Sequence, residues 1–192
     1  MARDTRERLL DVALAQFAAR GVEAVPVTDL EKGAGLSPGS GSFYRHFRSK
    51  ADVLAAVVDR EVDRVAAARD LQGPLRDMRD YYDWTLDNLQ RMGLLIALLV
   101  REGASLPHLD RIRTVIAEGG VAHDAADLRA RMERGDVPAR DAEAVAAVVQ
   151  AALTGYHLAA SFFGGSAVID RDRFTAALAS MVTGSTADDQ AW

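Results

Sequence analysis

Apolar side chains recur at helical spacing along almost the whole chain, and the alternation typical of strands is nearly absent. Glycines and prolines stand between the periodic segments, where they favour turns. The pattern predicts an all-α protein of about nine helices. The expected helices are 5–20, a short one that starts at residue 28, 37–46, 49–69, 75–101, 107–118, 121–134, 139–163 and 171–183.

Two of the expected helix starts carry capping signals. Thr28 stands three residues before Glu31, the spacing of a capping box in which each side chain accepts a hydrogen bond from an orphan backbone N–H. Ser49 is a favourable N-cap, and Asp52 lies in the first turn of the helix that follows it. We therefore expect Thr28 and Ser49 to begin the second and the fourth helix.

The segment between these two starts has the order of a helix-turn-helix motif. Ala34 and Gly35 are small enough for two helices to cross closely. Ser37-Pro38 is typical of an N-cap followed by the first helical position. Phe43 and Phe47 lie four residues apart and are expected to pack inward. In such a motif the second helix enters the major groove of DNA.

The polar side chains beside these phenylalanines are expected to face outward. Tyr44 and His46 can donate hydrogen bonds to phosphate. Arg45 can reach a phosphate or a guanine edge, and Lys50 near a helix start suits phosphate. This cluster predicts a sequence-specific DNA binder. The alternative is a three-helix bundle whose basic residues form an ordinary solvated surface.

Several short motifs in this part of the chain occur together. They are Phe17 with Gly21, Val27-Thr-Asp-Leu30, Ala34-Gly-Leu-Ser37, Phe43-Tyr-Arg-His-Phe47, and Ser49-Lys50 followed by Val53-Leu54. Residues 5–58 thereby resemble the N-terminal domain of the TetR family of transcriptional repressors. The resemblance implies nine to ten helices, of which the first three bind DNA and the rest form a ligand-binding, dimerising body.

The resemblance also implies which residues contact DNA. Thr28, Tyr44, His46 and Lys50 would contact phosphates, and the segment 37–42 would contact bases or backbone. With Arg45, the candidate set is Thr28, Ser37, Ser40, Ser42, Tyr44, Arg45, His46 and Lys50.

The segment before Tyr44 departs from the family pattern. The spacing from Ser37 to Tyr44 is longer than usual by about two residues, and the segment lacks the long polar side chains usual in base readout. It is either a longer turn before a shortened helix or an extra loop of helix. Base contacts would come from Ser40, Ser42, backbone N–H groups or Arg45, or specificity would rest partly on DNA shape.

The charge distribution supports a division into two parts. Residues 1–50 hold eight Lys or Arg and six Asp or Glu, a net charge of +2. The remainder carries a net charge of −7, so the whole chain has −5. We expect a DNA-binding domain at 1–50, linked through helix 49–70 to a body at 51–192, with a joint at Gln72-Gly73-Pro74.

The chain has no cysteine, which excludes disulfides and thiolate metal sites. Without a signal-peptide pattern or an apolar run of about 18 residues, a cytoplasmic protein is expected.

The body has the composition of a helical ligand-binding domain. Aromatic and methionine side chains with a few polar tips suit a mid-sized organic effector, although a plain helical core has the same composition. The resemblance implies a dimer formed by the last two helices, with which Val148, Ala152, Ala159, Phe174, Leu178 and Met181 are compatible. The candidate pocket residues are Trp84, Asn88, Met92, Arg101, Tyr156 and His157.

The resulting hypothesis is a homodimeric repressor that a small organic effector releases from a palindromic operator. It needs no cofactor and no metal, and it is not an enzyme. An activator is equally compatible with the sequence. His123-Asp124, with His108 upstream, faintly resembles a metal-dependent phosphohydrolase pattern. A helical interaction module that has lost DNA binding is the other alternative.

Overall fold

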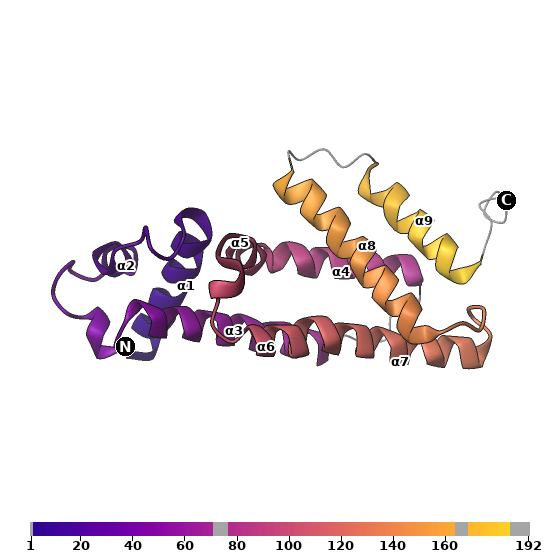
Figure 1. Ribbon diagram of the computed structural model, residues 1–192, viewed down its shortest axis with the longest axis horizontal. Helices are drawn as coiled ribbons and strands as arrows, with labels where there is room; N and C mark the ends of the chain where they lie inside the picture. Colours follow the sequence, from indigo (N-terminus) through magenta and orange to yellow (C-terminus); the bar gives the residue numbers. More distant parts are fainter. Residues whose placement is uncertain (1, 71–76, 164–168, 185–192) are drawn as a thin grey trace. The chain divides into compact units, whose positions relative to one another are not determined.

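The computed structural model describes residues 2–70, 77–163 and 169–184, and these residues form helices and no strand (Figure 1). Nine α-helices lie in the described residues. They are α1 (Ala2–Arg20), α2 (Val27–Gly33), α3 (Lys50–Asp70), α4 (Met78–Arg91), α5 (Gly93–Glu102), α6 (Leu109–Ile112), α7 (Gly119–Arg134), α8 (Ala142–Phe162) and α9 (Arg171–Thr183). Short 3-10 turns at Phe43–Arg45 and Gly103–Ser105 and a π-helical segment at Arg113–Glu118 complete the described elements. The all-α prediction is confirmed.

The number of α-helices agrees with the prediction, but three of the elements differ. The predicted helix 37–46 is wrong, because residues 37–42 form turns and only Phe43–Arg45 is helical. Gly39 and Gly41 have φ of 76° and 72°, a left-handed conformation that ends a right-handed helix.

The other two differences lie further along the chain. The predicted helix 75–101 is two helices, α4 and α5, which meet at a turn at Met92 before Gly93, a poor helix former. The predicted helix 107–118 is the four-residue α6 followed by the π-helical segment. Gly119 and Gly120, which were expected to separate helices, begin α7 instead.

The chain divides into two compact units. The first unit comprises residues 1–70 and 92–116, and the second comprises residues 71–91 and 117–192. The predicted division at residue 50 was drawn from charge and remains a prediction. The predicted joint at 72–74 lies outside the described residues.

The first unit is built around α1, which packs against α2, α3 and α5. Its core is an apolar cluster that includes Phe17, Leu30, Val57 and Leu98, all of them buried. Two long-range hydrogen bonds join the end of α5 to the last turns of α1 and to the loop that follows α1. Glu102 Oε1 accepts from Val22 N at 2.9 Å, and Arg101 Nε donates to Ala18 O at 3.2 Å.

The second unit is a bundle in which α8 packs against α7 and α4, and α4 also contacts α9. Tyr82, Leu128 and Leu153 lie in its apolar core. Asp141 caps α8 by accepting from Glu143 N and Ala144 N, both at 3.1 Å. α9 begins and ends at the predicted residues, with Asp170 as its cap.

α8 is long and apolar enough, by length and composition alone, to cross a membrane. Its most apolar window is 22% buried, and the helix packs against α7 and α4. Core helices of soluble proteins meet the same criterion, so this composition is weak evidence for a membrane span.

Ser49 begins α3 as the sequence predicts. Ser49 Oγ accepts from Asp52 N at 3.1 Å, and Asp52 Oδ2 accepts from Arg48 N at the same distance. The substitution Ser49→Ala should lower the free energy of unfolding of the first unit by about 1 kcal/mol, because one N–H at the helix start loses its acceptor. Urea unfolding followed by far-UV circular dichroism measures this. The matched control Ser161→Ala changes an exposed serine within α8 and should leave stability nearly unchanged. Equal stability of both variants would contradict the role of Ser49.

Candidate nucleic-acid interface

Glu31 on α2 holds the segment that follows the helix. The Glu31 side chain is buried, with 1% of its surface exposed. Its Oε2 accepts from Gly39 N at 2.6 Å, and its Oε1 accepts from Phe43 N at 3.1 Å. The predicted capping box is therefore wrong: Pro26 is the N-cap of α2, no side chain caps that helix, and Glu31 points to the far end of the segment.

Residues 37–40 of this segment are exposed. Ser40 N donates to Ser37 O at 3.2 Å, which closes a turn. The hydroxyls of Ser40 and Ser42 are 2.8 Å apart, and Ser42 N donates to Ser40 Oγ at 3.3 Å. Two of the three predicted serines thus bond to each other, while Ser37 stands in the exposed turn.

The aromatic residues after the segment are arranged as the helical spacing predicts. Phe43 has no exposed surface and Phe47 has 5%, and their ring centroids are 5.7 Å apart. Tyr44 is 61% exposed and meets Phe43 edge-on at 5.3 Å. Because Phe43 and Phe47 fill the core, Tyr44 and Arg45 face solvent.

The cations beside Tyr44 do not pair with carboxylates. Within the described residues, Arg45, Arg48 and Lys50 form no ion pair, and Lys50 Nζ donates to Glu23 O at 3.2 Å. Arginines on the far half of α3 differ, because Arg60 and Arg64 both pair with Glu61. Unpaired cations around an exposed tyrosine are suited to bind phosphates.

The two remaining candidates lie on the same unit. Thr28 is exposed in the first turn of α2, and His46 is half-buried at the end of the 3-10 turn. Sequence reasoning missed the role of Glu31. A signal was available, since Glu31 lies four residues after the inward-facing Val27, on the side of α2 that carries Leu30 and Ala34.

Comparison with known proteins agrees with this geometry. Residues 9–57 match the family model of the bacterial regulatory proteins of the tetR family. The N-terminal part of the chain therefore matches the DNA-binding region of the TetR family. The HTH-type transcriptional repressor KstR2 of Mycobacterium tuberculosis is 37% identical over 93 residues, which cover 48% of this chain and 41% of that protein. An HTH-type transcriptional regulator of Staphylococcus aureus is 34% identical over 62 residues, 32% of each protein. The matches thus span less than half the length of these two relatives.

Solved structures show that the TetR fold extends over nearly the whole chain. The reduced form of NemR from E. coli superimposes with a TM-score of 0.69 at 24% identity, and covers 93% of this chain and 97% of its own. The regulatory protein TetR from Rhodobacter sphaeroides gives a TM-score of 0.67 at 22% identity, over 92% and 97% of the two chains. At these identities the likeness concerns the fold alone.

The six candidate pocket residues belong to different units of this TetR-family fold. Met92 and Arg101 lie in the first unit, where Arg101 donates to a backbone carbonyl of α1. The other four lie in the second unit. There Tyr156 stacks on Phe174 at 4.3 Å between ring centroids, and Asn88 Nδ2 donates to Trp84 O at 3.0 Å.

Among the described residues of the second unit, two buried side-chain polar atoms have no hydrogen-bond partner. They are Tyr82 Oη and His157 Nε2. His157 was among the predicted pocket residues, and Tyr82 was not. Beside Tyr82, Tyr81 Oη donates to Asp124, and Gln150 Nε2 donates to Asp124 Oδ2 at 2.8 Å. Burial raises the pKa of Tyr82, with the nearby charge of Asp124 acting in the same direction. The phenol of Tyr82 therefore stays protonated and can donate to an acceptor.

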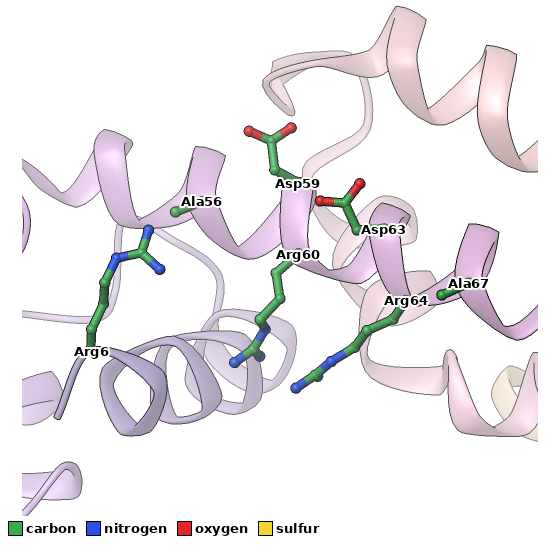
Figure 2. Close-up of a pocket in the computed structure, with 7 residues that line it drawn as sticks. All are labelled: Arg6, Ala56, Asp59, Arg60, Asp63, Arg64 and Ala67. Atoms are coloured by element: carbon green, nitrogen blue, oxygen red, sulfur yellow. The ribbon is translucent and has the colours of Figure 1, made fainter. Parts of the chain in front are cut away.

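An open groove of about 540 Å³ lies between α1 and α3 in the first unit (Figure 2). None of the predicted pocket residues lines it. Asp59 and Asp63 point to one side of α3, and Arg60 and Arg64 point to the other. Asp59 accepts from Arg111 at 2.6 Å, and Arg60 pairs with carboxylates of α1, so charges within the unit already satisfy these groups.

The metal-site alternative lacks a ligand set in the described part of the chain. No group of three His, Asp or Glu side chains there could hold a metal ion. His108 Nδ1 instead lies 2.8 Å from Asp59 Oδ1, and Asp124 accepts from Tyr81 and Gln150.

The buried His157 predicts a pH dependence of stability. Burial lowers the pKa of His157 below its usual value of about 6.5, because the charged imidazolium loses hydration. As the pH falls, the unfolded chain takes up a proton at His157 before the folded chain does. The free energy of unfolding should therefore decrease below about pH 6.5, whereas above this pH His157 should cause no loss of stability.

Urea unfolding at pH 7.5 and 5.5 measures this effect. The variant His157→Gln should lose the part of the pH dependence that belongs to His157. The control His123→Gln, at an exposed position on α7, should keep it. Identical pH dependence in both variants would refute the assignment.

Proposed function

We propose that this protein is a TetR-family transcriptional regulator that binds double-stranded DNA at a specific sequence. The observation that carries the proposal is the unpaired cluster of Arg45, Arg48 and Lys50 around the exposed Tyr44. Such a surface can bind a phosphate backbone directly, because its cations need not first break ion pairs with carboxylates. The match of residues 9–57 to the tetR family model supports it, because these residues include the whole cluster.

The mode of base reading differs from that of a helix lying in the major groove. A three-residue turn at Phe43–Arg45 replaces most of the predicted recognition helix. We infer that phosphate contacts by Thr28, Tyr44, His46 and Lys50 position the unit. Arg45 and the segment with Ser37, Ser40 and Ser42 would then contact base edges. Sequence-dependent DNA shape would supply the rest of the specificity.

Selection of bound duplexes from a random DNA library at two salt concentrations tests the function. An enriched motif, with affinity that falls as salt rises, is expected for a sequence-specific binder. The double variant Tyr44→Phe/Lys50→Ala should weaken binding to selected and random duplexes alike and reduce the salt slope by about 1, because a phosphate contact is lost. The control Arg129→Ala removes an exposed cation of α7 and should leave binding unchanged. An enriched motif with no effect of the double variant would contradict the assigned phosphate contacts.

A homodimer formed through α8 and α9 is the assembly we propose. Val148 on α8 is 66% exposed and Met181 on α9 is 71% exposed. Large apolar side chains exposed on neighbouring helices of a bundle are typical of a surface that a second copy covers. Of the other predicted interface residues, Leu178 is buried within the single chain, and Ala152, Ala159 and Phe174 are half-buried. Two copies would read a palindrome whose half-sites are about one DNA turn apart.

The substitution Met181→Glu tests this assembly. A carboxylate buried there without a partner should raise the dimer dissociation constant by more than about tenfold. Analytical ultracentrifugation measures the change. The control Ala126→Glu places the same charge on the exposed side of α7 and should leave the dimer intact. A Met181→Glu protein that dimerises as tightly as the wild type would refute this interface.

The regulation we propose is repression relieved by a small organic effector in the second unit. Two buried atoms without a hydrogen-bond partner among the described residues, Tyr82 Oη and His157 Nε2, would each be able to bond a polar group of that molecule. The effector must favour the state that does not bind DNA, by about 1–3 kcal/mol. Activation in place of repression remains the second candidate. A cytoplasmic protein without catalytic activity follows from this role.

A further inference from the structure

Glu31 is an unusual buried residue. Carboxylates are almost never fully buried unless they are paired, yet Glu31 is 1% exposed. No Lys or Arg forms an ion pair with it in the described residues. Its side-chain partners are the backbone N–H groups of Gly39 and Phe43, one on each carboxylate oxygen. Such N–H groups stabilise an ionised carboxylate and can compensate its lost hydration.

The two N–H groups lie at either end of a short stretch in which Ser40 is exposed and Gly41 and Ser42 are half-buried. Gly39 and Phe43 enclose residues 40–42, and the Phe43 ring is buried in the core of the first unit. The carboxylate therefore joins the solvent-facing part of the segment to a rigid position beneath it.

The segment has little other order of its own. Its internal hydrogen bonds span at most three residues: Ser40 N to Ser37 O, Tyr44 N to Gly41 O, and the bonds between Ser40 and Ser42. Gly39 and Gly41 add conformational freedom that must be lost when the segment is held in place. Without Glu31, the N–H groups of Gly39 and Phe43 would lack acceptors, and other conformations of the segment would compete.

We propose that Glu31 is a positioning residue that determines which DNA sequence the protein reads. This inference rests on the proposed DNA-binding function. The exposed segment offers serine hydroxyls and backbone groups but no long base-reading side chain. Short groups discriminate bases only when the backbone that carries them is held rigidly, and the Glu31 carboxylate supplies that rigidity.

The charge of Glu31 allows its positioning role to be separated from simple electrostatics. A negative charge beneath a DNA-binding surface opposes the approach of phosphates. If charge alone mattered, Glu31→Gln would strengthen binding to all DNA. If position matters, the amide keeps one acceptor oxygen but cannot accept at its NH₂ group. One of the two hydrogen bonds from the backbone N–H groups is then lost. Binding to the operator should weaken, while binding to random DNA should not.

The test compares Glu31→Gln with Asp29→Asn. Asp29 lies on the same helix and carries the same charge, but its carboxylate pairs with Arg20 at 2.7 Å and has no bond to the segment. The affinities of each protein are measured for the duplex that the wild type selects and for a random duplex of equal length. Glu31→Gln should lower the ratio of the two affinities by about tenfold or more, and Asp29→Asn should leave the ratio nearly unchanged.

Amide hydrogen exchange provides a second readout that does not depend on DNA. Exchange at Gly39 and Phe43 should accelerate in Glu31→Gln and not in Asp29→Asn, while Phe17 in α1 keeps its protection in both. The variant Val25→Ala, which destabilises the core of the same unit, controls for stability. Val25→Ala should leave the affinity ratio unchanged.

The outcomes separate the two levels of the proposal. If the wild type selects a motif and Glu31→Gln keeps the affinity ratio, the role of Glu31 is refuted while the DNA-binding function stands. An equal loss of the ratio in Val25→Ala would also refute it, because stability would then explain the effect. If the wild type binds no DNA, the proposed function itself fails.

Discussion

Burial of Phe43 is the constraint on which the polar surface of the first unit depends. With the rings of Phe43 and Phe47 in the core, the backbone between them must turn Tyr44 and Arg45 to solvent. The same burial points the Phe43 N–H inward, where only a buried acceptor can satisfy it. Glu31 is that acceptor. An apolar contact and a polar one thus define a single conformation of the chain around Phe43.

The two contacts contribute in different ways. Apolar burial is non-directional, so it places the Phe43 ring without specifying the path of the residues before it. The hydrogen bonds from Gly39 and Phe43 to Glu31 are directional and select one path. The cations that would meet phosphate lie just outside, at Arg45 and Lys50, and no carboxylate of the described residues pairs with them. Around Phe43, the Glu31 carboxylate therefore lies inside the unit, and the Arg45 and Lys50 side chains lie nearer the solvent.

The second unit combines a helical core with a few internal polar groups. Asp124 accepts from Tyr81 and Gln150, whereas Tyr82 Oη and His157 Nε2 have no partner. A buried polar atom without a partner costs about 1–3 kcal/mol, so these atoms are places where a bound polar group would be stabilising. Val148 on α8 and Met181 on α9 are exposed large apolar side chains, which the proposed dimer would cover.

Local patterns were sufficient to predict much of this protein. Helical periodicity is a property of neighbouring residues, so it predicted the helical class, the start of α3 at Ser49, the limits of α9, and the inward and outward faces around Phe43. The same local reasoning placed the family resemblance within residues 5–58, which contain the matched region.

The incorrect predictions depend on partners far away along the chain. Glu31 was expected to bond three residues back, but it bonds Phe43 twelve residues ahead. The hydrogen bond from Arg101 Nε to Ala18 O, 83 residues earlier, is likewise one that no local pattern predicts. Local sequence alone therefore determined which segments are helical and which residues of the first unit face outward. Only the tertiary structure decided where the buried polar groups find their partners, because these hydrogen bonds exist only once distant segments have packed together.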